Sequence, residues 1–310
     1  MPRSVKTLTN QPQWCRSMVF VDAHDEKLIM GVAKLKPDSL CWDLEDSTPG
    51  KYKEQARKLF PKLAKEVAGL GVKVMARVNP GMEMEDLDAV VCPELHCAQI
   101  SKTNSAKDVT DFCAVLSVIE KKKGLPPGYT LVRPVVETAQ GARQAYEIAS
   151  ASPRIAYMGG VHGSRMGDLG VSMGYRNTPS GIESYYIRAK VIVDVRAAGV
   201  PFPVGGGGGT GRDLASRRAS AEMARDMGYS GGYASAHFNL DGFAPILNAI
   251  HDVFNPAKED LKRWLELIPV LEKARGEGTV LVETKYGFFD TACLKTMQEE
   301  VALAKRVGLI

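Results

Sequence analysis

The sequence contains no apolar run that approaches the roughly 20 residues needed for a membrane-spanning helix. Its first residues are polar and lack the apolar segment of a secretory signal peptide. The six cysteines include no Cys-x-x-Cys pair and do not suggest the disulfide framework of a small secreted protein. We therefore expect a cytoplasmic protein with reduced thiols and no membrane partner.

Charge of one sign is also scarce. The 40 lysines and arginines exceed the 36 aspartates and glutamates by only a formal net charge of +4, and the basic residues are spread along the chain. The sequence has no basic stripe with interleaved aromatic residues, so we expect no nucleic-acid partner. A mildly basic protein would still concentrate anionic small molecules.

No Gly-x-Gly-x-x-Gly motif follows the first predicted strand, which disfavours a dinucleotide-binding open sheet. The sequence does contain short apolar, β-rich runs that alternate with amphipathic helical stretches. The predicted strands are residues 18–21, 39–43, 74–78, 98–101, 131–136, 155–158, 201–204 and 232–236. Eight alternations favour parallel strands with right-handed crossovers, so we predict an α/β fold, a (β/α)8 TIM barrel, over residues 1–255.

The pattern changes after residue 255, where two helical stretches flank the segment 279–289. We predict that residues 256–310 form a C-terminal helical extension that packs on the barrel or on a neighbouring subunit. Five consecutive glycines at 205–209 follow the seventh predicted strand. They are typical either of a phosphate-binding loop of a barrel or of a plain surface loop, and both interpretations stay open.

Barrel enzymes carry their catalytic groups at the carboxyl ends of the strands. The second predicted strand ends in Asp43, Glu45 and Asp46, whose mutual repulsion a metal, an arginine or water would relieve. A cluster of helix-capping residues is the alternative. The third strand ends in Arg77, which could bind a substrate carboxylate, neutralise these acids, or do both.

Glu137 ends the fifth strand, and Asp168 follows the sixth in a glycine-rich loop. Two oxygen ligands without a cysteine or histidine pair suit Mg²⁺ or Mn²⁺, although each residue alone could be a cap or a turn residue. Lys102 ends the fourth strand, so a Schiff-base mechanism stays open. His24 and His162 are candidate general bases or structural histidines.

The order and spacing of several motifs resemble the citrate lyase β-subunit-like branch of the HpcH/HpaI aldolase superfamily. These motifs are RSMVF at 16–20, WDLEDS at 42–47, ARVNP at 76–80, VVETAQG at 135–141 and GDLG at 167–170, followed by His237 and F-x-P at 254–256. The resemblance covers about residues 16–290. It implies a (β/α)8 barrel, a Mg²⁺ ion and substrates such as citryl-, malyl- or citramalyl-CoA.

The resemblance also implies roles for individual residues. The metal ligands would be Glu137 and Asp168, and Arg77 would bind the keto-acid or enolate oxygens. Glu45 and Asp46 resemble an acidic pair that orders metal-bound water or supporting hydrogen bonds. Other candidates are Asp43, Gly167 and Asp168 for substrate binding, and Asp290 of the GFFD segment 287–290, near a neighbouring subunit's active site.

We therefore predict a Mg²⁺-dependent carbon–carbon lyase that cleaves or forms a 3-hydroxyacyl-CoA or a related hydroxy acid through a metal-stabilised enolate. Two alternatives remain: a CoA-independent class II-type aldolase that gives pyruvate or oxaloacetate, and a non-catalytic barrel subunit of a larger complex. The sequence departs from the family around the barrel mouth, at 21–24, at 101–102, in a longer loop before Asp168 that contains His162 and Arg165, and at 234–239, so the use of CoA stays open. We expect a homo-oligomer, a trimer or a hexamer.

Overall fold

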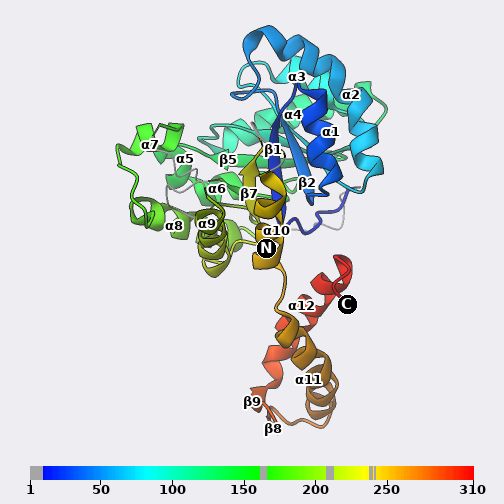
Figure 1. Cartoon of the computed structure of the whole chain (residues 1–310), viewed down its shortest axis with the longest axis vertical. Coiled ribbons are helices and arrows are strands. Elements are labelled where there is room, and N and C mark those ends of the chain that lie inside the picture. Colours follow the sequence, from blue (N-terminus) through cyan, green and yellow to red (C-terminus); the bar gives the residue numbers. More distant parts are fainter. Residues whose placement is uncertain (1–9, 161–165, 207–212, 237–239, 241) are drawn as a thin grey trace. The chain divides into compact units, whose positions relative to one another are not determined.

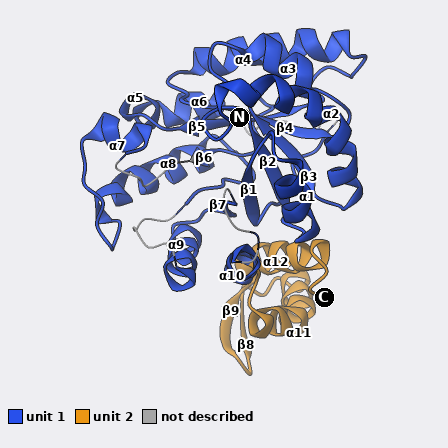
Figure 2. Ribbon diagram, turned by 45° about the horizontal axis from the view of Figure 1, so that its top comes forward, with its two compact units in different colours: residues 1–254 blue, residues 255–310 orange. Residues whose placement is uncertain are grey.

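The computed structural model describes residues 10–160, 166–206, 213–236, 240 and 242–310. The chain divides into two compact units, Met1–Phe254 and Asn255–Ile310 (Figure 2). The larger unit contains a parallel sheet flanked by helices, and the smaller unit contains two helices and a hairpin (Figure 1).

The sheet of the larger unit is curled and parallel, with the strand order β6-β5-β4-β3-β2-β1-β7 among the described residues. Its strands are β1 (Ser17–Asp22), β2 (Ser39–Asp43), β3 (Lys73–Arg77), β4 (Leu95–Ile100), β5 (Leu131–Val136), β6 (Gly159–Gly160) and β7 (Gly232–Ser235). Every residue of β2, β4 and β5 is buried, as expected for parallel strands covered on both faces.

Helices connect the strands and pack alongside them (Figure 1). They are α1 (Glu26–Lys34), α2 (Lys53–Gly69), α3 (Glu83–Val90), α4 (Ala106–Lys122), α5 (Ala139–Arg143), α6 (Ala145–Ser150), α7 (Asp168–Met173), α8 (Tyr185–Ala197), α9 (Leu214–Asp226) and α10 (Phe243–Phe254), with 3₁₀ turns at Gly50–Tyr52 and Ile182–Ser184. Helix α2 packs on β2 through Phe60, whose ring centroid lies 4.4 Å from that of Trp42. Such contacts bury the apolar stripe that marked these segments as helical in the sequence.

The predicted α/β class with a parallel sheet is confirmed, but a complete eight-stranded barrel is not. The segment 155–158 makes parallel-sheet hydrogen bonds on both sides, from Ala156 N to Val132 O (3.3 Å) and from Val204 N to Met158 O (3.1 Å). The predicted seventh strand at 201–204 contributes isolated parallel bridges, from Val204 to Gly159 and to Gly231. In the described residues, therefore, the segment around Val204 connects the two edge strands of the sheet through isolated bridges and backbone hydrogen bonds, without forming a regular strand.

Successive layers of side chains fill the inner face of the curled sheet. One layer is apolar and comprises Met18, Cys41, Met75, Cys97 and Leu131, all at most 1% exposed. Side chains two residues apart on a strand point to the same face. The next layer toward the carboxyl ends is therefore Phe20, Asp43, Arg77, Gln99 and Arg133, which is mostly polar. The sheet thus changes from a hydrophobic core to a polar pocket within two residues.

The smaller unit contains α11 (Lys258–Gly276), β8 (Leu281–Thr284), β9 (Gly287–Asp290), a 3₁₀ turn (Thr291–Cys293) and α12 (Leu294–Arg306). Strands β8 and β9 form an antiparallel hairpin within the segment that the sequence analysis left unassigned between two helices. Trp264 packs edge-on against Phe289 and donates a 2.7 Å hydrogen bond from Nε1 to Glu300. These contacts give the unit a small core of its own.

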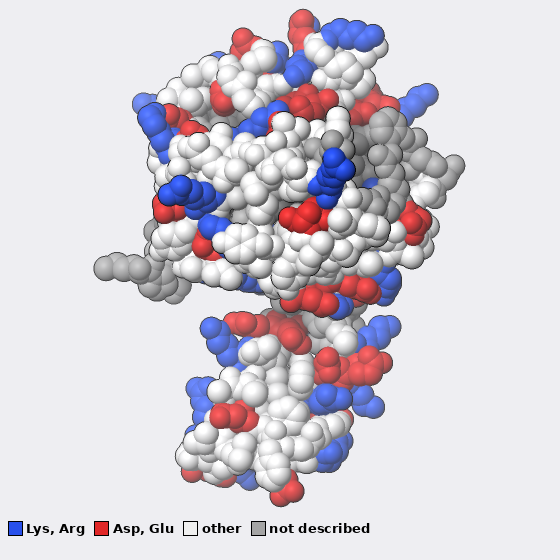
Figure 3. Space-filling model, turned by 90° about the vertical axis from the view of Figure 1, so that its left-hand side faces the viewer, with Lys and Arg blue, Asp and Glu red and all other residues white. Residues whose placement is uncertain are grey.

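The described residues include no helix with the length and apolar character required to cross a membrane. On the face of the larger unit shown in Figure 3, the described basic and acidic side chains are interspersed, without a continuous area of one sign.

Candidate functional site

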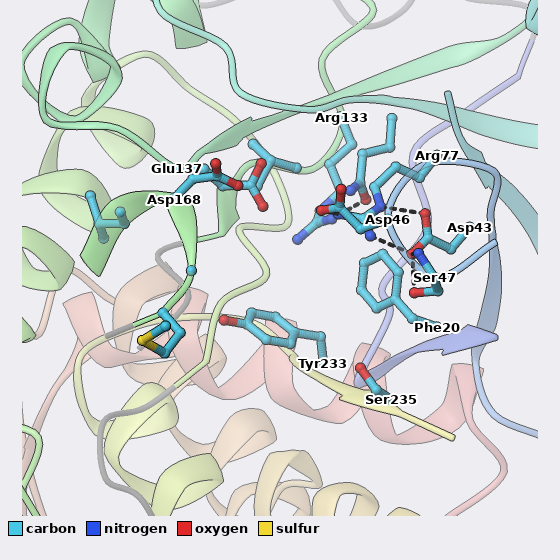
Figure 4. Close-up of a pocket in the computed structure, with 15 residues that line it drawn as sticks. Phe20, Asp43, Asp46, Ser47, Arg77, Arg133, Glu137, Asp168, Tyr233 and Ser235 are labelled. Carbon is cyan, nitrogen blue, oxygen red and sulfur yellow. Dashed lines mark hydrogen bonds and ion pairs between the residues drawn. The ribbon is translucent and has the colours of Figure 1, made fainter. Parts of the chain in front are cut away.

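A pocket of about 350 Å³ lies at the carboxyl ends of the strands, above the apolar layer. Strands β1 to β5 and β7 and the start of α7 supply its walls. Figure 4 shows Glu137 and Asp168 on one side and Asp43, Arg77 and Ser47 on the other, with Arg133 and Asp46 among them. The structure therefore brings six predicted site residues into one pocket: Asp43, Asp46, Arg77, Glu137, Gly167 and Asp168.

Asp43 and Arg77 form a two-pronged ion pair between neighbouring strands, at paired positions of β2 and β3. Arg77 Nε donates to Asp43 Oδ1 at 2.7 Å, and Nη2 donates to Oδ2. Burial alone would raise the pKa of Asp43, but the hydrogen bonds and the charge of Arg77 outweigh it and hold that pKa below its usual value. Burial would likewise lower the pKa of Arg77, but Asp43 raises it, so both groups stay charged.

Arg77 also relieves the repulsion expected among the acids that follow β2. Its Nη1 lies 2.9 Å from Glu45 Oε2 and 3.7 Å from Asp46 Oδ2. Glu45 is buried, with 5% of its side chain exposed, whereas the Asp46 side chain is 59% exposed. The interpretation of Arg77 as the neutralising residue is thus confirmed, and its position in the pocket is also compatible with substrate binding.

Lys102 is a second cation among these carboxylates, and the sequence analysis did not foresee its contacts. Its Nζ lies 3.1 Å from Glu45 Oε1, 3.8 Å from Asp46 Oδ1 and 3.5 Å from Asp168 Oδ2. Burial would lower the pKa of Lys102, but the hydrogen bond and charge of Glu45, with further help from Asp46 and Asp168, raise it. A Schiff base requires a neutral amine, so this environment disfavours the covalent mechanism that the sequence left open.

Glu137 lies directly after β5, and its Oε2 accepts a 3.0 Å hydrogen bond from the backbone N–H of Lys102. Burial raises the pKa of Glu137, and the charges of Glu45 and Asp168 add to this effect, while Arg77 opposes it. Asp168 is the first residue of α7 and shares the pocket with Glu137. A carboxylate whose charge is disfavoured by burial and by another acid is a group that a bound cation would stabilise.

These two acids fit a divalent metal ion by their chemistry. Carboxylate oxygens are the ligands that Mg²⁺ prefers, and Mg²⁺ is commonly held by one or two carboxylates, with water and substrate completing its shell. The described residues contain no group of three or more histidine, cysteine, aspartate or glutamate side chains arranged to hold a metal. A two-carboxylate site open to ligand therefore fits better than a closed protein cage.

The pocket is also lined by residues that the sequence analysis did not select, among them Phe20, Gln99, Arg133 and Tyr233. Arg133 is 1% exposed, donates from Nη1 to Gln99 Oε1, and burial lowers its pKa. A sequence signal was available for it, because Arg133 precedes Glu137 by four residues, and even spacing along a strand places side chains on the same face.

Other predicted residues are not among those that line this pocket in the described part of the chain. His24 stacks on Tyr52, with ring centroids 4.4 Å apart, beside a different pocket. Asp290 belongs to the smaller unit, where it accepts a 2.7 Å hydrogen bond from Ala292 N. His162, His237 and residues 207–209 of the glycine run lie outside the described residues.

The described part of the glycine run has a packing explanation. A Cβ at Gly205 would meet the ring of Tyr229 at 2.6 Å, and one at Gly206 would meet that of Tyr233 at 2.8 Å. Both distances are too short for a side chain, so glycine is required here by neighbouring aromatic rings.

Sequence comparison matches residues 16–235 to a family described as HpcH/HpaI aldolase/citrate lyase. Among individual relatives, citrate lyase subunit beta of Haemophilus influenzae is 27% identical over 272 residues, covering 86% of this chain and 89% of the relative. A (3S)-malyl-CoA thioesterase of Cereibacter sphaeroides is 30% identical over 308 residues, covering 97% and 98%.

Solved structures with the same fold include a citrate lyase from Burkholderia xenovorans, with a TM-score of 0.75, 17% identity and coverage of 98% of this chain and 95% of that one. Protein CitE from Mycobacterium tuberculosis, in complex with magnesium, acetoacetate and coenzyme A, has a TM-score of 0.67 and 17% identity, with coverage of 95% and 99%. At these identities the likeness supports the fold alone.

Proposed function

Because the chain belongs to the HpcH/HpaI aldolase/citrate lyase family and is a metal-dependent lyase, we propose that it cleaves or forms the carbon–carbon bond of a 3-hydroxyacyl-CoA or a related hydroxy acid. One observation carries the proposal: Glu137, Asp168 and Arg77 line the same pocket. An anionic pair fit for a hard cation thus shares that pocket with a guanidinium.

Glu137 and Asp168 would hold Mg²⁺, with the Lys102 amide orienting Glu137. When bound, the ion would supply a Lewis acid that polarises a carbonyl oxygen of the substrate. The M. tuberculosis protein has been solved with magnesium and pyruvate, and with magnesium and oxaloacetate, which supports small keto acids as ligands of the family.

Arg77 has donors left for a substrate oxygen. A guanidinium carries five N–H groups. The hydrogen bonds to Asp43 use two of them, on Nε and Nη2, and Nη1 lies 2.9 Å from Glu45 Oε2. Because those contacts fix the plane of the group, a remaining N–H is already oriented when negative charge grows on a substrate oxygen.

Asp46 is our candidate for the proton acceptor. It lines the pocket, its side chain is 59% exposed, and its nearest cationic contacts are 3.7 and 3.8 Å long. In the cleavage direction it would take the proton of the substrate hydroxyl while the electrons of the broken carbon–carbon bond pass to the departing enolate. Glu45 is more buried and held between Arg77 and Lys102, so it orients these two cations.

The proposal is tested by assaying malyl-CoA, citramalyl-CoA and the free hydroxy acids with and without Mg²⁺. We expect Mg²⁺-dependent release of a keto acid, lost in Asp168→Asn and retained in Asp226→Asn, a surface aspartate beside Arg225. Cleavage of only the free acids would favour a CoA-independent aldolase, and thiol release without a keto acid would indicate thioester hydrolysis. No Mg²⁺-dependent turnover of any substrate would contradict the proposal and favour a non-catalytic subunit.

Two structural proposals accompany this function. We propose that the ring of strands closes through the segment around Val204, which already bridges Gly159 and Gly231. We also propose a homo-oligomer in which Asp290 serves a neighbouring active site. Mixing Asp168→Asn and Asp290→Asn subunits should then restore part of the activity, whereas full activity of Asp290→Asn alone would contradict this role.

A further inference from the structure

Four polar side chains occupy paired positions on four neighbouring strands. Asp43 on β2 pairs with Arg77 on β3, Arg77 pairs with Gln99 on β4, and Gln99 pairs with Arg133 on β5. All four line the pocket. Their formal charges run negative, positive, neutral, positive, so the row has one more cation than anion.

The unmatched cation is Arg133. It is 1% exposed, its Nη1 donates to the uncharged Gln99, and its Nε is buried without a hydrogen-bond partner. Across the described ranges, no aspartate or glutamate forms an ion pair with it, and the charge of Glu137 acts on it only through space. A buried charge without an ionic partner is unfavourable in the free protein.

The two pocket arginines lie close to a single aromatic ring. The guanidinium carbon of Arg77 is 5.7 Å from the centroid of Phe20, and that of Arg133 is 5.9 Å from the same centroid. Asp43 and Glu45 balance the charge of Arg77. An anion that entered the pocket would therefore gain most from Arg133, whose charge no carboxylate of the row has matched.

We propose that Arg133, held by Gln99, binds a second carboxylate of the substrate and makes the pocket select keto acids with two carboxylates over those with one. This inference rests on the proposed function, because it assumes that the keto group lies at Glu137 and Asp168. A carboxylate suits the site since the planar fork of a guanidinium matches it in shape.

The experiment compares two keto acids by isothermal titration calorimetry in the presence of Mg²⁺. Pyruvate and oxaloacetate share the chelating end, and only oxaloacetate carries a second carboxylate, so pyruvate is an internal control for the metal site. Lactate and malate, which are stable 2-hydroxy acids, repeat the comparison. We expect wild-type protein to bind the dicarboxylates more tightly by on the order of 10- to 100-fold, the contribution of a hydrogen bond to a charged group.

Arg133→Met keeps the length of the side chain and removes its charge. In this variant we expect the preference to fall below about twofold while pyruvate binding stays unchanged, because only the second carboxylate loses its partner. Arg133→Lys should retain part of the preference. Unchanged preference in Arg133→Met, or an equal loss for both acids, would overturn the proposal.

The proposed function can fail separately. If wild-type protein bound neither keto acid in a Mg²⁺-dependent way, the metal site would be misassigned, and malonate binding without metal would then test Arg133 alone. Loss of malonate binding in Arg133→Met would support the carboxylate site, whereas no malonate binding by wild-type protein would overturn it. The unfolding midpoint of each variant shows that it is folded.

Discussion

Buried charged groups are paired differently at the amino ends and at the carboxyl ends of the parallel strands. At the amino end, beside the start of β5, Arg154 donates to both oxygens of Glu120, at 2.7 and 2.9 Å, and Glu120 also accepts from Thr130 N at 2.7 Å. At the carboxyl end, Arg133 has an uncharged partner, and burial raises the pKa of Glu137. The two regions adjoin opposite ends of β5, which Thr130 precedes and Glu137 follows.

The charged groups at the amino end stabilise the fold, whereas those at the carboxyl end are positioned by the fold. In the Glu120–Arg154 pair each charge is neutralised by the other, so neither group is left to bind a ligand. The pocket leaves a cation and two acids only partly compensated, which costs stability and leaves interactions for a substrate and a metal ion. The same division, with stability at one end of the strands and chemistry at the other, is general for (β/α)8 barrels.

The largest effect should come from exchanging one glutamate at each end. Glu137→Gln should lower turnover by roughly three orders of magnitude because it removes a proposed metal ligand. It should leave the unfolding midpoint unchanged or higher, since burial disfavours the charge of Glu137. Steady-state assays together with thermal unfolding measure both quantities.

Glu120→Gln is the matched variant at the amino end. It leaves Arg154 buried without a carboxylate, so we expect a loss of about 3 kcal/mol in the free energy of unfolding, with turnover per folded molecule unchanged. If the two glutamates gave the same pattern of activity and stability, the contrast between the two ends would be wrong.

Replacing each arginine by methionine should change the free energy of unfolding differently at the two ends. Arg154→Met leaves Glu120, whose side chain is fully buried, without a cationic partner. We expect this variant to lose about 3–5 kcal/mol in the free energy of unfolding. Arg133→Met removes a cation without an ionic partner, so we expect no loss, or a gain of about 1 kcal/mol. Urea unfolding at neutral pH measures both, and a larger loss for Arg133→Met than for Arg154→Met would contradict the assignment of the two ends.

A smaller effect is expected from pH at the amino end. Burial, with help from the charge of Lys73, lowers the pKa of His96 from 6.5 to about 3, and His96 Nε2 lies 2.9 Å from the Tyr157 hydroxyl. Below pH 6.5, His96 therefore binds a proton in the unfolded chain but stays neutral in the folded chain until the pH approaches 3. The contribution of His96 to the free energy of unfolding is complete above pH 6.5 and declines as the pH falls toward 3. Between pH 7 and pH 5 the decline is about 2 kcal/mol.

His96→Gln isolates this contribution because glutamine can hydrogen-bond to Tyr157 but does not titrate. Urea unfolding at pH 7 and pH 5 should show a smaller loss in the variant than in wild-type protein. Equal losses would mean that other groups cause the acid sensitivity.

Much of the fold could be predicted from the sequence. The runs 39–43 and 131–136 were placed within their observed bounds, because fully buried parallel strands are continuously apolar. The region from 155 to 204 was less predictable. Its pairing depends on Val204, Gly159 and Gly231, which are far apart in the sequence, and isolated bridges leave no periodic pattern.

The functional site, too, could be predicted from the sequence only in part. Asp43, Arg77, Glu137 and Asp168 could be found because polar residues that end apolar strands stand out in the sequence. Arg133 sits inside a strand, and Gln99 matters only through its register with Arg133, which long-range pairing decides. The contacts of Lys102 depend on its φ of 50°, a left-handed conformation that no lysine pattern predicts.

That conformation at Lys102 has an evolutionary consequence. The main chain at this position orients Glu137, while the side chain adds an ammonium group to the acids around it. Asparagine or glycine adopts a positive φ more readily than lysine, so either could replace it and preserve the backbone hydrogen bond. The electrostatics of the mouth could therefore drift among descendants of this chain without disturbing the orientation of the acid that precedes α5.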